Sequence, residues 1–232
     1  MPHKHEFQPS TIEHYEICLE CGTMHRIGGI DDSVYANQYW SQPHRSTLLE
    51  QVYNVSELKF DGRSKIDCVL YYDNGGVCAL EIACAPGILL KRLSETYHIT
   101  AGIEFDSQYA DQYRAIAGEN PTLLFGKFPS ITKACPAMQF DFICGMDILE
   151  HVEDGCAFIL EVQRLLKPTG TVVLMLPVKF DDGKFDDKNY HPEHLWIYSQ
   201  SFLKEWLGEM FKTIIFDRWT VGHEIIVLRN PY

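Results

Sequence analysis

The sequence of 232 residues lacks any hydrophobic run of membrane-spanning length. Its longest run, residues 171–176, is as long as a strand, whereas a spanning helix needs roughly 18 apolar residues. The first five residues also lack the apolar segment that forms the core of a secretory signal. These absences predict a cytoplasmic protein with no membrane partner.

Runs of basic residues are missing as well. Asp and Glu number 32 against 20 Lys and Arg, which gives a formal net charge of −12, and the basic residues occur singly or in pairs. A protein that tracks a nucleic acid needs positive charge along the phosphates. A nucleic-acid partner is therefore disfavoured.

The eight cysteines do not indicate a disulfide framework, because no export signal accompanies them. Cys78, Cys84 and Cys144 lie in or beside apolar runs, where cysteine usually acts as a small buried hydrophobic residue. Cys18 and Cys21 differ from the rest because they form a spaced pair followed by glycine, which is typical of half a zinc ribbon.

The chain divides into two parts by texture. Residues 1–45 are polar and show no sustained period, which indicates an N-terminal appendage. Residues 46–232 form one domain in which strand-like and helix-like patterns alternate. The predicted strands are 77–82, 99–105, 122–125, 140–145, 171–176, 211–216 and 224–228. The predicted helices are 46–53, 66–72, 86–96, 107–117, 153–166 and 199–208.

Alternation of strands and helices over residues 77–176 predicts right-handed crossovers and a doubly wound sheet. The last two strands have only a loop between them, so they should pair antiparallel. The expected fold is α/β, with a mostly parallel sheet of seven strands whose last strand is antiparallel.

The loop after the first of these strands is the first place to look for a ligand, because ligands bind at the carboxyl ends of strands in such sheets. Ala83, Ala85 and Gly87 are small enough for close approach of a ligand. A dinucleotide fingerprint is disfavoured because Ile88 stands at its sixth step. The alternative interpretation, that this loop is only a turn between a strand and a helix, also remains. We expect both alanines to keep negative φ, and Pro86 to start the helix.

Glu81 with Ala83, Ala85 and Gly87 resembles motif I of class I S-adenosylmethionine-dependent methyltransferases, with alanine at two glycine positions. Residues 140–154 resemble the Phe-Asp strand and Leu-Glu-His-Val segment of small-molecule methyltransferases. The Leu-Lys-Pro-Thr-Gly turn at 166–170 is similar to theirs. The resemblance covers about residues 46–230 and implies the Rossmann-like methyltransferase fold.

The resemblance implies S-adenosylmethionine as cofactor. It places Glu104 on the ribose hydroxyls and Phe105 beside the adenine, while Lys127 replaces an acid that often contacts the adenine amine. Asp147 either faces the cofactor or caps a turn. The implied cofactor-binding residues are Glu81, Ala83, Cys84, Ala85, Gly87, Glu104, Phe105, Lys127, Phe128, Met146 and Asp147.

The implied activity is methyl transfer to an oxygen or carbon atom of a small-molecule acceptor. His151 is a candidate base, or else a residue that packs locally at a helix start. His191 and His194 lie in an insertion that lines the acceptor pocket of the resembling enzymes, and they can act as base or bind acceptor oxygens. The alternative is a catalytically silent S-adenosylmethionine-binding or partner-binding protein, motivated by the two alanines and Lys127.

Residues 17–40 resemble the later half of a four-cysteine zinc ribbon that some sugar C-methyltransferases carry at the N-terminus. No second Cys-x-x-Cys pair is present, so His3 and His5 would have to complete a site with Cys18 and Cys21. Two interpretations stay open, a zinc ion on these four residues or a metal-free knuckle.

Overall fold

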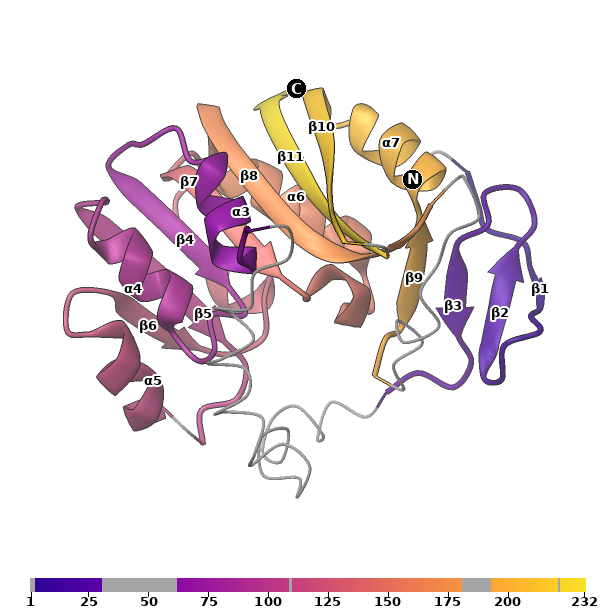
Figure 1. Ribbon diagram of the computed structural model, residues 1–232, viewed down its shortest axis with the longest axis horizontal. Helices are drawn as coiled ribbons and strands as arrows, with labels where there is room; N and C mark the ends of the chain where they lie inside the picture. The colour runs from indigo at the N-terminus through magenta and orange to yellow at the C-terminus, as the bar shows by residue number, and fades with distance from the viewer. Residues whose placement is uncertain (1–2, 31–61, 109, 181–192, 221) are drawn as a thin grey trace.

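The computed structural model describes residues 3–30, 62–108, 110–180, 193–220 and 222–232. Its centre is a sheet in which five parallel strands lie in the order β6-β5-β4-β7-β8 (Figure 1). Their bounds are β4 (Cys78–Ile82), β5 (Ile99–Glu104), β6 (Thr122–Phe125), β7 (Phe140–Met146) and β8 (Leu166–Lys179). The prediction of a doubly wound parallel sheet is confirmed.

Two C-terminal strands complete the seven. Strand β11 (His223–Pro231) pairs antiparallel with β8 on one side and with β10 (Phe211–Thr220) on the other. The predicted antiparallel closing pair is therefore confirmed. Both strands run longer than predicted, and β8 extends three residues past the predicted end at residue 176.

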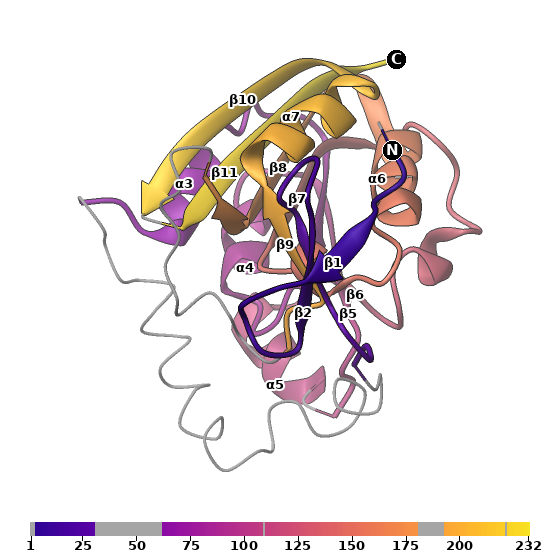
Figure 2. The same ribbon diagram turned by 90° about the vertical axis from the view of Figure 1, so that its right-hand side faces the viewer.

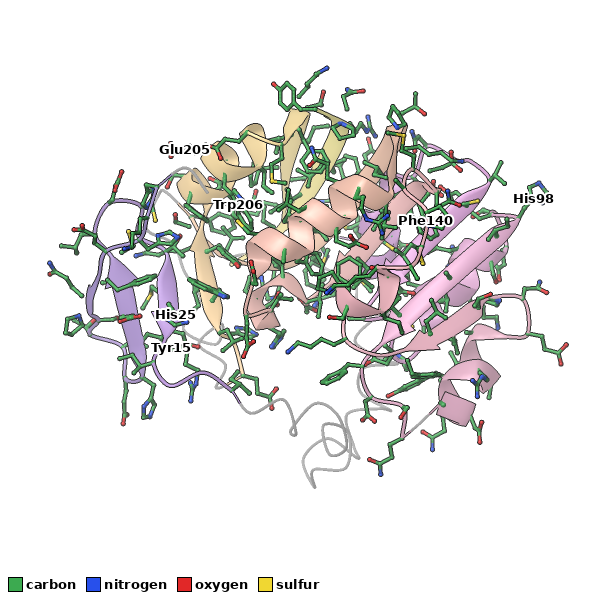
Figure 3. All side chains as sticks on the ribbon, turned by 180° about the vertical axis from the view of Figure 1, so that it is seen from behind. Tyr15, His25, His98, Phe140, Glu205 and Trp206 are labelled. Carbon is green, nitrogen blue, oxygen red and sulfur yellow. The ribbon has the colours of Figure 1, made fainter. Side chains whose placement is uncertain are left out.

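Helices cover both faces of this sheet (Figures 1 and 3). On one face α3 (Lys65–Tyr71) and α4 (Ile88–Ser94) enclose a hydrophobic cluster, and α5 (Ala110–Ala117) packs against α4. On the other face α6 (Gly155–Leu165) and α7 (Gln200–Gly208) bury Phe158 and Trp206. Short turns η1 (Ser130–Thr132) and η2 (Leu149–His151) follow β6 and β7. No described helix is long and apolar enough to cross a membrane.

The N-terminal appendage forms strands that the sequence did not indicate. Strands β1 (Phe7–Pro9), β2 (Tyr15–Cys18) and β3 (Met24–Arg26) make an antiparallel meander. Strand β3 pairs with β9 (Trp196–Ser199), and β9 pairs with the end of β8 (Figure 2). These strands of three or four residues are too short to show a period of two, and the pairing of β3 with β9 joins segments distant in the sequence.

Some predicted features cannot be compared. The helix over 46–53, the domain boundary at residue 45 and the Tyr-rich part of residues 17–40 lie outside the described residues. The described appendage is continuous with the central sheet through β9.

Asp141 ties the start of β4 to β7 and β8. Its Oδ2 accepts hydrogen bonds from the amides of Val77 (2.8 Å) and Cys78 (2.9 Å) and from Nζ of Lys167 (2.8 Å). Burial opposes the charge of this carboxylate, but the hydrogen bonds from Lys167 and the two amides outweigh burial and lower its pKa below the usual value. The ionised form is therefore stabilised by folding.

We expect Asp141→Asn to lower the free energy of unfolding at pH 7 by about 1.5–3 kcal/mol, the contribution of a hydrogen bond to a charged group. Because the pKa of Asp141 is lower in the folded state, its contribution is present above the unfolded value of about 3.9 and is lost as the pH falls below it. Urea unfolding at pH 7 and at acidic pH measures both effects.

Asp111→Asn is the matched control, because the Asp111 side chain is fully exposed to solvent although it lies 3.4 Å from Arg114. We expect no measurable change in stability for this variant. An Asp141→Asn variant as stable as the control at pH 7 would contradict the assigned role.

Candidate active site

The loop between β4 and α4 makes a sharper turn than the sequence suggested. Ala83 has a φ of 59°, so the prediction that it keeps a negative φ is wrong, whereas Ala85 does keep one. The turn brings the amide of Cys84 to the carbonyl of Ile103 (3.1 Å), which places the thiol of Cys84 in the core. A left-handed alanine costs roughly 1–2 kcal/mol, and this packing offsets it.

Helix α4 begins at Ile88, with Gly87 as its N-cap, so Pro86 precedes the helix instead of starting it as predicted. Gly87 has a φ of 99°, and a Cβ there would lie 3.0 Å from the carbonyl oxygen of Tyr113. Glycine is therefore required at this position by both backbone conformation and the close approach of α5.

Glu104 closes this loop onto the end of β5. Its carboxylate accepts hydrogen bonds from the amides of Ala85 (3.1 Å), Phe105 (2.8 Å) and Asp106 (3.1 Å). The side chain is nearly buried, and burial raises its pKa although the three amides oppose the change. A carboxylate offers about four acceptor positions, so capacity for a ligand hydroxyl remains.

Glu81 is a second buried carboxyl beside it, on the neighbouring strand. It is 3% exposed, and its Oε2 has no hydrogen-bond partner among the described residues. Burial raises its pKa well above the usual value, and the negative charge of Glu104 adds to the change. Two buried acids near the carboxyl ends of neighbouring strands suit a ligand that carries positive charge and hydroxyl groups. The residues therefore fit S-adenosylmethionine.

Asp147 follows β7 and forms an ion pair with Lys65 of α3. Nε2 of His223 lies 3.6 Å from its other oxygen. Burial opposes the charge of Asp147, but Lys65 and His223 outweigh burial and lower its pKa. Sequence analysis missed Lys65, since nothing in the sequence links it to a residue after β7.

The remaining predicted cofactor residues have different surroundings. Phe128 packs edge-to-face against Phe158 in the core, with ring centroids 4.9 Å apart. Nζ of Lys127 lies 4.0 Å from the carboxylate of Glu153. Met146 packs against the cluster under α3 and α4, and Phe105 is half-buried after β5. The carboxyl ends of β4 and β5 and the loop after β4 thus carry five of the predicted residues, namely Glu81, Ala83, Ala85, Gly87 and Glu104. Asp147 follows the neighbouring strand β7.

Two predicted catalytic histidines meet at the exit of β7. The rings of His151 and His194 lie 4.9 Å apart and nearly perpendicular. Nδ1 of His151 donates to the carbonyl of Glu193 (2.8 Å), because a carbonyl can only accept. The amide of Leu195 donates to the carbonyl of Glu150 (2.9 Å), which fixes the segment against η2. His191 lies outside the described residues.

Glu150 is buried beneath this pair, and sequence analysis gave it no role. It is 0% exposed, and neither carboxyl oxygen has a hydrogen-bond partner among the described residues. Its Oε1 lies 4.0 Å from Nε2 of His151. Burial raises the pKa of Glu150 well above the usual value, and the charge of Asp147 adds to the change. Glu150 belongs to the same Leu-Glu-His-Val segment as His151, but nothing in the sequence indicates that its carboxyl is buried.

Comparisons with known proteins agree with this geometry. A family model described as "Methyltransferase domain" matches residues 32–210. A relative named ubiquinone biosynthesis O-methyltransferase, from Actinobacillus pleuropneumoniae serotype 5b, is 29% identical over 116 residues, which cover 47% of this chain and 50% of the relative. The chain thus spans about half the length of this curated relative.

A relative named tRNA U34 carboxymethyltransferase, from Pseudoalteromonas translucida, is 27% identical over 147 residues, which cover 60% of this chain and 46% of the relative. A solved complex of the Haloferax volcanii Trm112 methyltransferase activator with a putative methyltransferase gives a TM-score of 0.63 at 14% identity. That likeness covers 84% of this chain and 97% of the other, and it shows a shared fold.

We expect Glu150→Gln to change how stability depends on pH. The raised pKa means that folded Glu150 keeps a proton that the unfolded chain releases above about pH 4.3. The wild type therefore loses stability as the pH rises above that value, by up to about 1.4 kcal/mol per pH unit, until the folded pKa is reached. The uncharged variant lacks this loss, so it should gain stability relative to the wild type as the pH rises above about 4.3.

Urea unfolding at several pH values measures this difference. Glu119→Gln serves as control because Glu119 is exposed. Parallel pH profiles for Glu150→Gln and the wild type would contradict a buried, protonated Glu150.

Proposed function

The chain belongs to the methyltransferase-domain family, and from this membership we propose that it transfers a methyl group from S-adenosylmethionine to an oxygen or carbon atom of a small-molecule acceptor. The observation that carries the proposal is the pairing of buried carboxyl groups at β4 and β5 with a histidine pair at the exit of β7. The name of the Actinobacillus relative, an O-methyltransferase, favours an oxygen acceptor.

S-adenosylmethionine supplies a methyl group on a positively charged sulfur, and the protein aligns this group with the acceptor. The one acceptor position that Glu104 has left would take a hydrogen bond from a ribose hydroxyl, while its bonds to the backbone amides hold it in place. Glu81, whose Oε2 lacks a partner among the described residues, would face the positive part of the ligand. A cation nearby would favour the ionised form of Glu81 and offset the cost of its burial.

His151 is the proposed base that removes the acceptor proton. Since its Nδ1 carries hydrogen toward the carbonyl of Glu193, the neutral ring has its lone pair on Nε2, the form that a base needs. Oε1 of Glu150 lies 4.0 Å from this nitrogen, so a proton taken up by His151 would favour the ionised form of Glu150. His194 would help to position the acceptor oxygen from the facing segment.

We expect Glu104→Gln to weaken binding of S-adenosylmethionine by roughly 10- to 150-fold, which corresponds to about 1.5–3 kcal/mol for hydrogen bonds to a charged group. Calorimetric titration of the wild type and variant measures the change. Glu119→Gln is the matched control, because it removes a charge from an exposed position. Equal affinity of Glu104→Gln and wild type would exclude the assigned site.

For His151→Gln we expect turnover to fall by roughly 10²- to 10⁴-fold, the usual contribution of a general base, while affinity for S-adenosylmethionine is unchanged. Formation of S-adenosylhomocysteine with a panel of phenols, catechols and hydroxy acids measures turnover. His194→Gln should mainly raise KM. His98→Gln is the control, since His98 is exposed and lies before β5.

Two other functions are outcomes of the same assays. Methylation of tRNA alone would favour an RNA acceptor, as the name of the Pseudoalteromonas relative suggests, against the net charge of −12. Binding of S-adenosylmethionine without any turnover would favour a silent binding protein, in keeping with the alanines at 83 and 85. A millimolar dissociation constant is already a very weak affinity, so absence of binding at millimolar S-adenosylmethionine would exclude the proposed function.

A further inference from the structure

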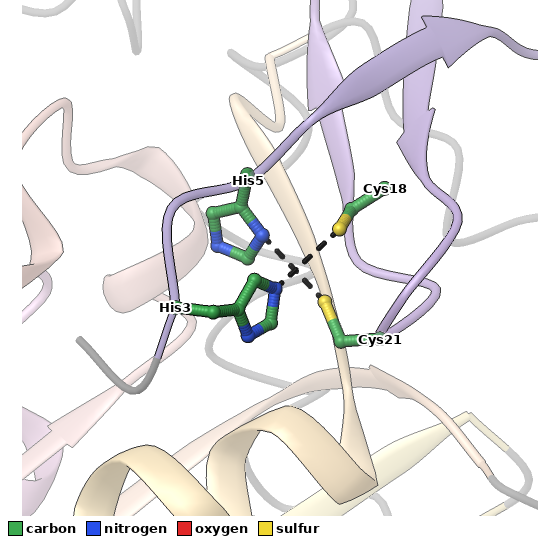
Figure 4. A group of neighbouring side chains, drawn as sticks. All are labelled: His3, His5, Cys18 and Cys21. Atoms are coloured by element: carbon green, nitrogen blue, oxygen red, sulfur yellow. Dashed lines mark hydrogen bonds between the residues drawn. The ribbon is translucent and has the colours of Figure 1, made fainter.

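Four metal-binding side chains meet at one end of the N-terminal strands (Figure 4). Cys18 ends β2 and Cys21 lies in the turn to β3, while His3 and His5 precede β1. Their donor atoms all lie within 4.8 Å of one another. We propose that these four side chains bind a zinc ion, and that the ion fastens the N-terminal strands to the acceptor side of the active site.

The distances fit a tetrahedral zinc site. Sγ of Cys18 lies 3.5 Å from Nε2 of His3, and Sγ of Cys21 lies 3.6 Å from Nδ1 of His5. Zinc bonds of about 2.3 Å to sulfur and 2.05 Å to nitrogen at the tetrahedral angle separate the two donors by about 3.6 Å. An ion can therefore be accommodated with little movement of these pairs. Both cysteines are free thiols, and two sulfur and two nitrogen donors in this geometry are typical of zinc.

The local backbone explains why the donors converge. The amide of Gly22 donates to the carbonyl of Cys18 (2.8 Å), and Gly22 has a φ of 73°, so the chain turns sharply between the two cysteines and β3. In the β1–β2 ladder Phe7 lies opposite Cys18, which brings the residues before β1 to the same end. The hairpin thus forms the site from two separate segments.

The cluster also contacts the main domain. The ring centroid of His5 lies 4.7 Å from that of Phe202 in α7, and the ring of His3 lies 5.8 Å from it. The exposed carboxylate of Glu20 lies 3.9 Å from Nε2 of His3. An ion on the four donors would hold the histidines, and the residues before β1, against α7.

The same strands hold the segment that carries His194. The hydroxyl of Tyr15 donates to the carbonyl of His194 (2.8 Å), and the amide of Arg26 donates to the carbonyl of Leu195 (2.8 Å). Strand β3 continues this contact by pairing Met24 with Ile197 of β9. The zinc site therefore acts as a positioning element for His194, through β2 and β3.

Metal analysis of the purified full-length chain is the first test, and we expect one zinc per chain, the content of a single site. After removal of the metal under reducing conditions, added Co²⁺ should give the visible absorption of a tetrahedral site with thiolate ligands. His5→Phe keeps a ring against Phe202 but removes the donor, so it should lose both signals. His5→Cys restores a zinc ligand and should recover them.

Two variants serve as controls for these measurements. Glu20→Gln removes the neighbouring exposed carboxylate, and Cys135→Ser removes a thiol elsewhere in the chain. Both should retain the metal. Absence of zinc together with absence of tetrahedral Co²⁺ absorption in the wild type would overturn the proposal, as would full metal binding by His5→Phe.

Amide hydrogen exchange tests the positioning role without any methyl donor or acceptor. Removal of zinc should speed exchange at Leu195 and Ile197 by roughly tenfold or more, because the strands that cover them loosen. Exchange in β4 and β5 should be unchanged, which also shows that the domain remains folded. Equal exchange at residues 195–197 with and without zinc would overturn the positioning role. Because neither outcome depends on S-adenosylmethionine, the zinc site and the methyltransferase activity can fail independently.

Discussion

Strand β8 connects the two sides of the active site. Along most of its length it lies between β7 and β11, and beyond β7 its last residues, Val178 and Lys179, pair with β9. The carbonyl of Met175 accepts a hydrogen bond from the amide of Asp147 (2.8 Å), so the exit of β7 is held against β8 as well. The extension of β8 is what allows β9 and the N-terminal strands to join the sheet. The segment that carries His194 is held separately, by the backbone hydrogen bonds of Leu195 with Glu150 and Arg26.

Buried acids lie at or just after the carboxyl ends of the parallel strands β4, β5 and β7. Glu81, Glu104 and Glu150 are all buried, and burial raises the pKa of each. Such groups reduce stability in the absence of a partner, and they persist mainly at functional sites. Asp147 differs because Lys65 neutralises it. A positively charged ligand near Glu81 and Glu104 would supply for them what Lys65 supplies for Asp147.

The sequence predicted the central sheet well, because strands such as β4 and β8 are largely buried and largely apolar, with Glu81 as the exception within β4. Strands β1, β2, β3 and β9 escaped prediction because each has only three or four residues, and the pairing of β3 with β9 joins segments distant in the sequence. Glu104 and His151 could be singled out because their segments resemble methyltransferase motifs. Lys65 and the contact between His151 and His194 depend on tertiary packing, and Ala83 adopts a backbone conformation that alanine rarely takes.

The proposed cofactor and acceptor sides of the site are built from different elements of the fold. Substitutions on one side are therefore constrained by different contacts from those on the other. The proposed cofactor side consists of one loop and the ends of adjacent parallel strands, and a side chain at Gly87 would come within 3.0 Å of the Tyr113 carbonyl in α5. The proposed acceptor side consists of η2, residues 193–196 and strands β2 and β3, which are joined by a few hydrogen bonds. Its substitutions need not disturb the sheet, since β3 and β9 lie beyond its parallel core. Acceptor preference can therefore change on this fold while cofactor binding is maintained.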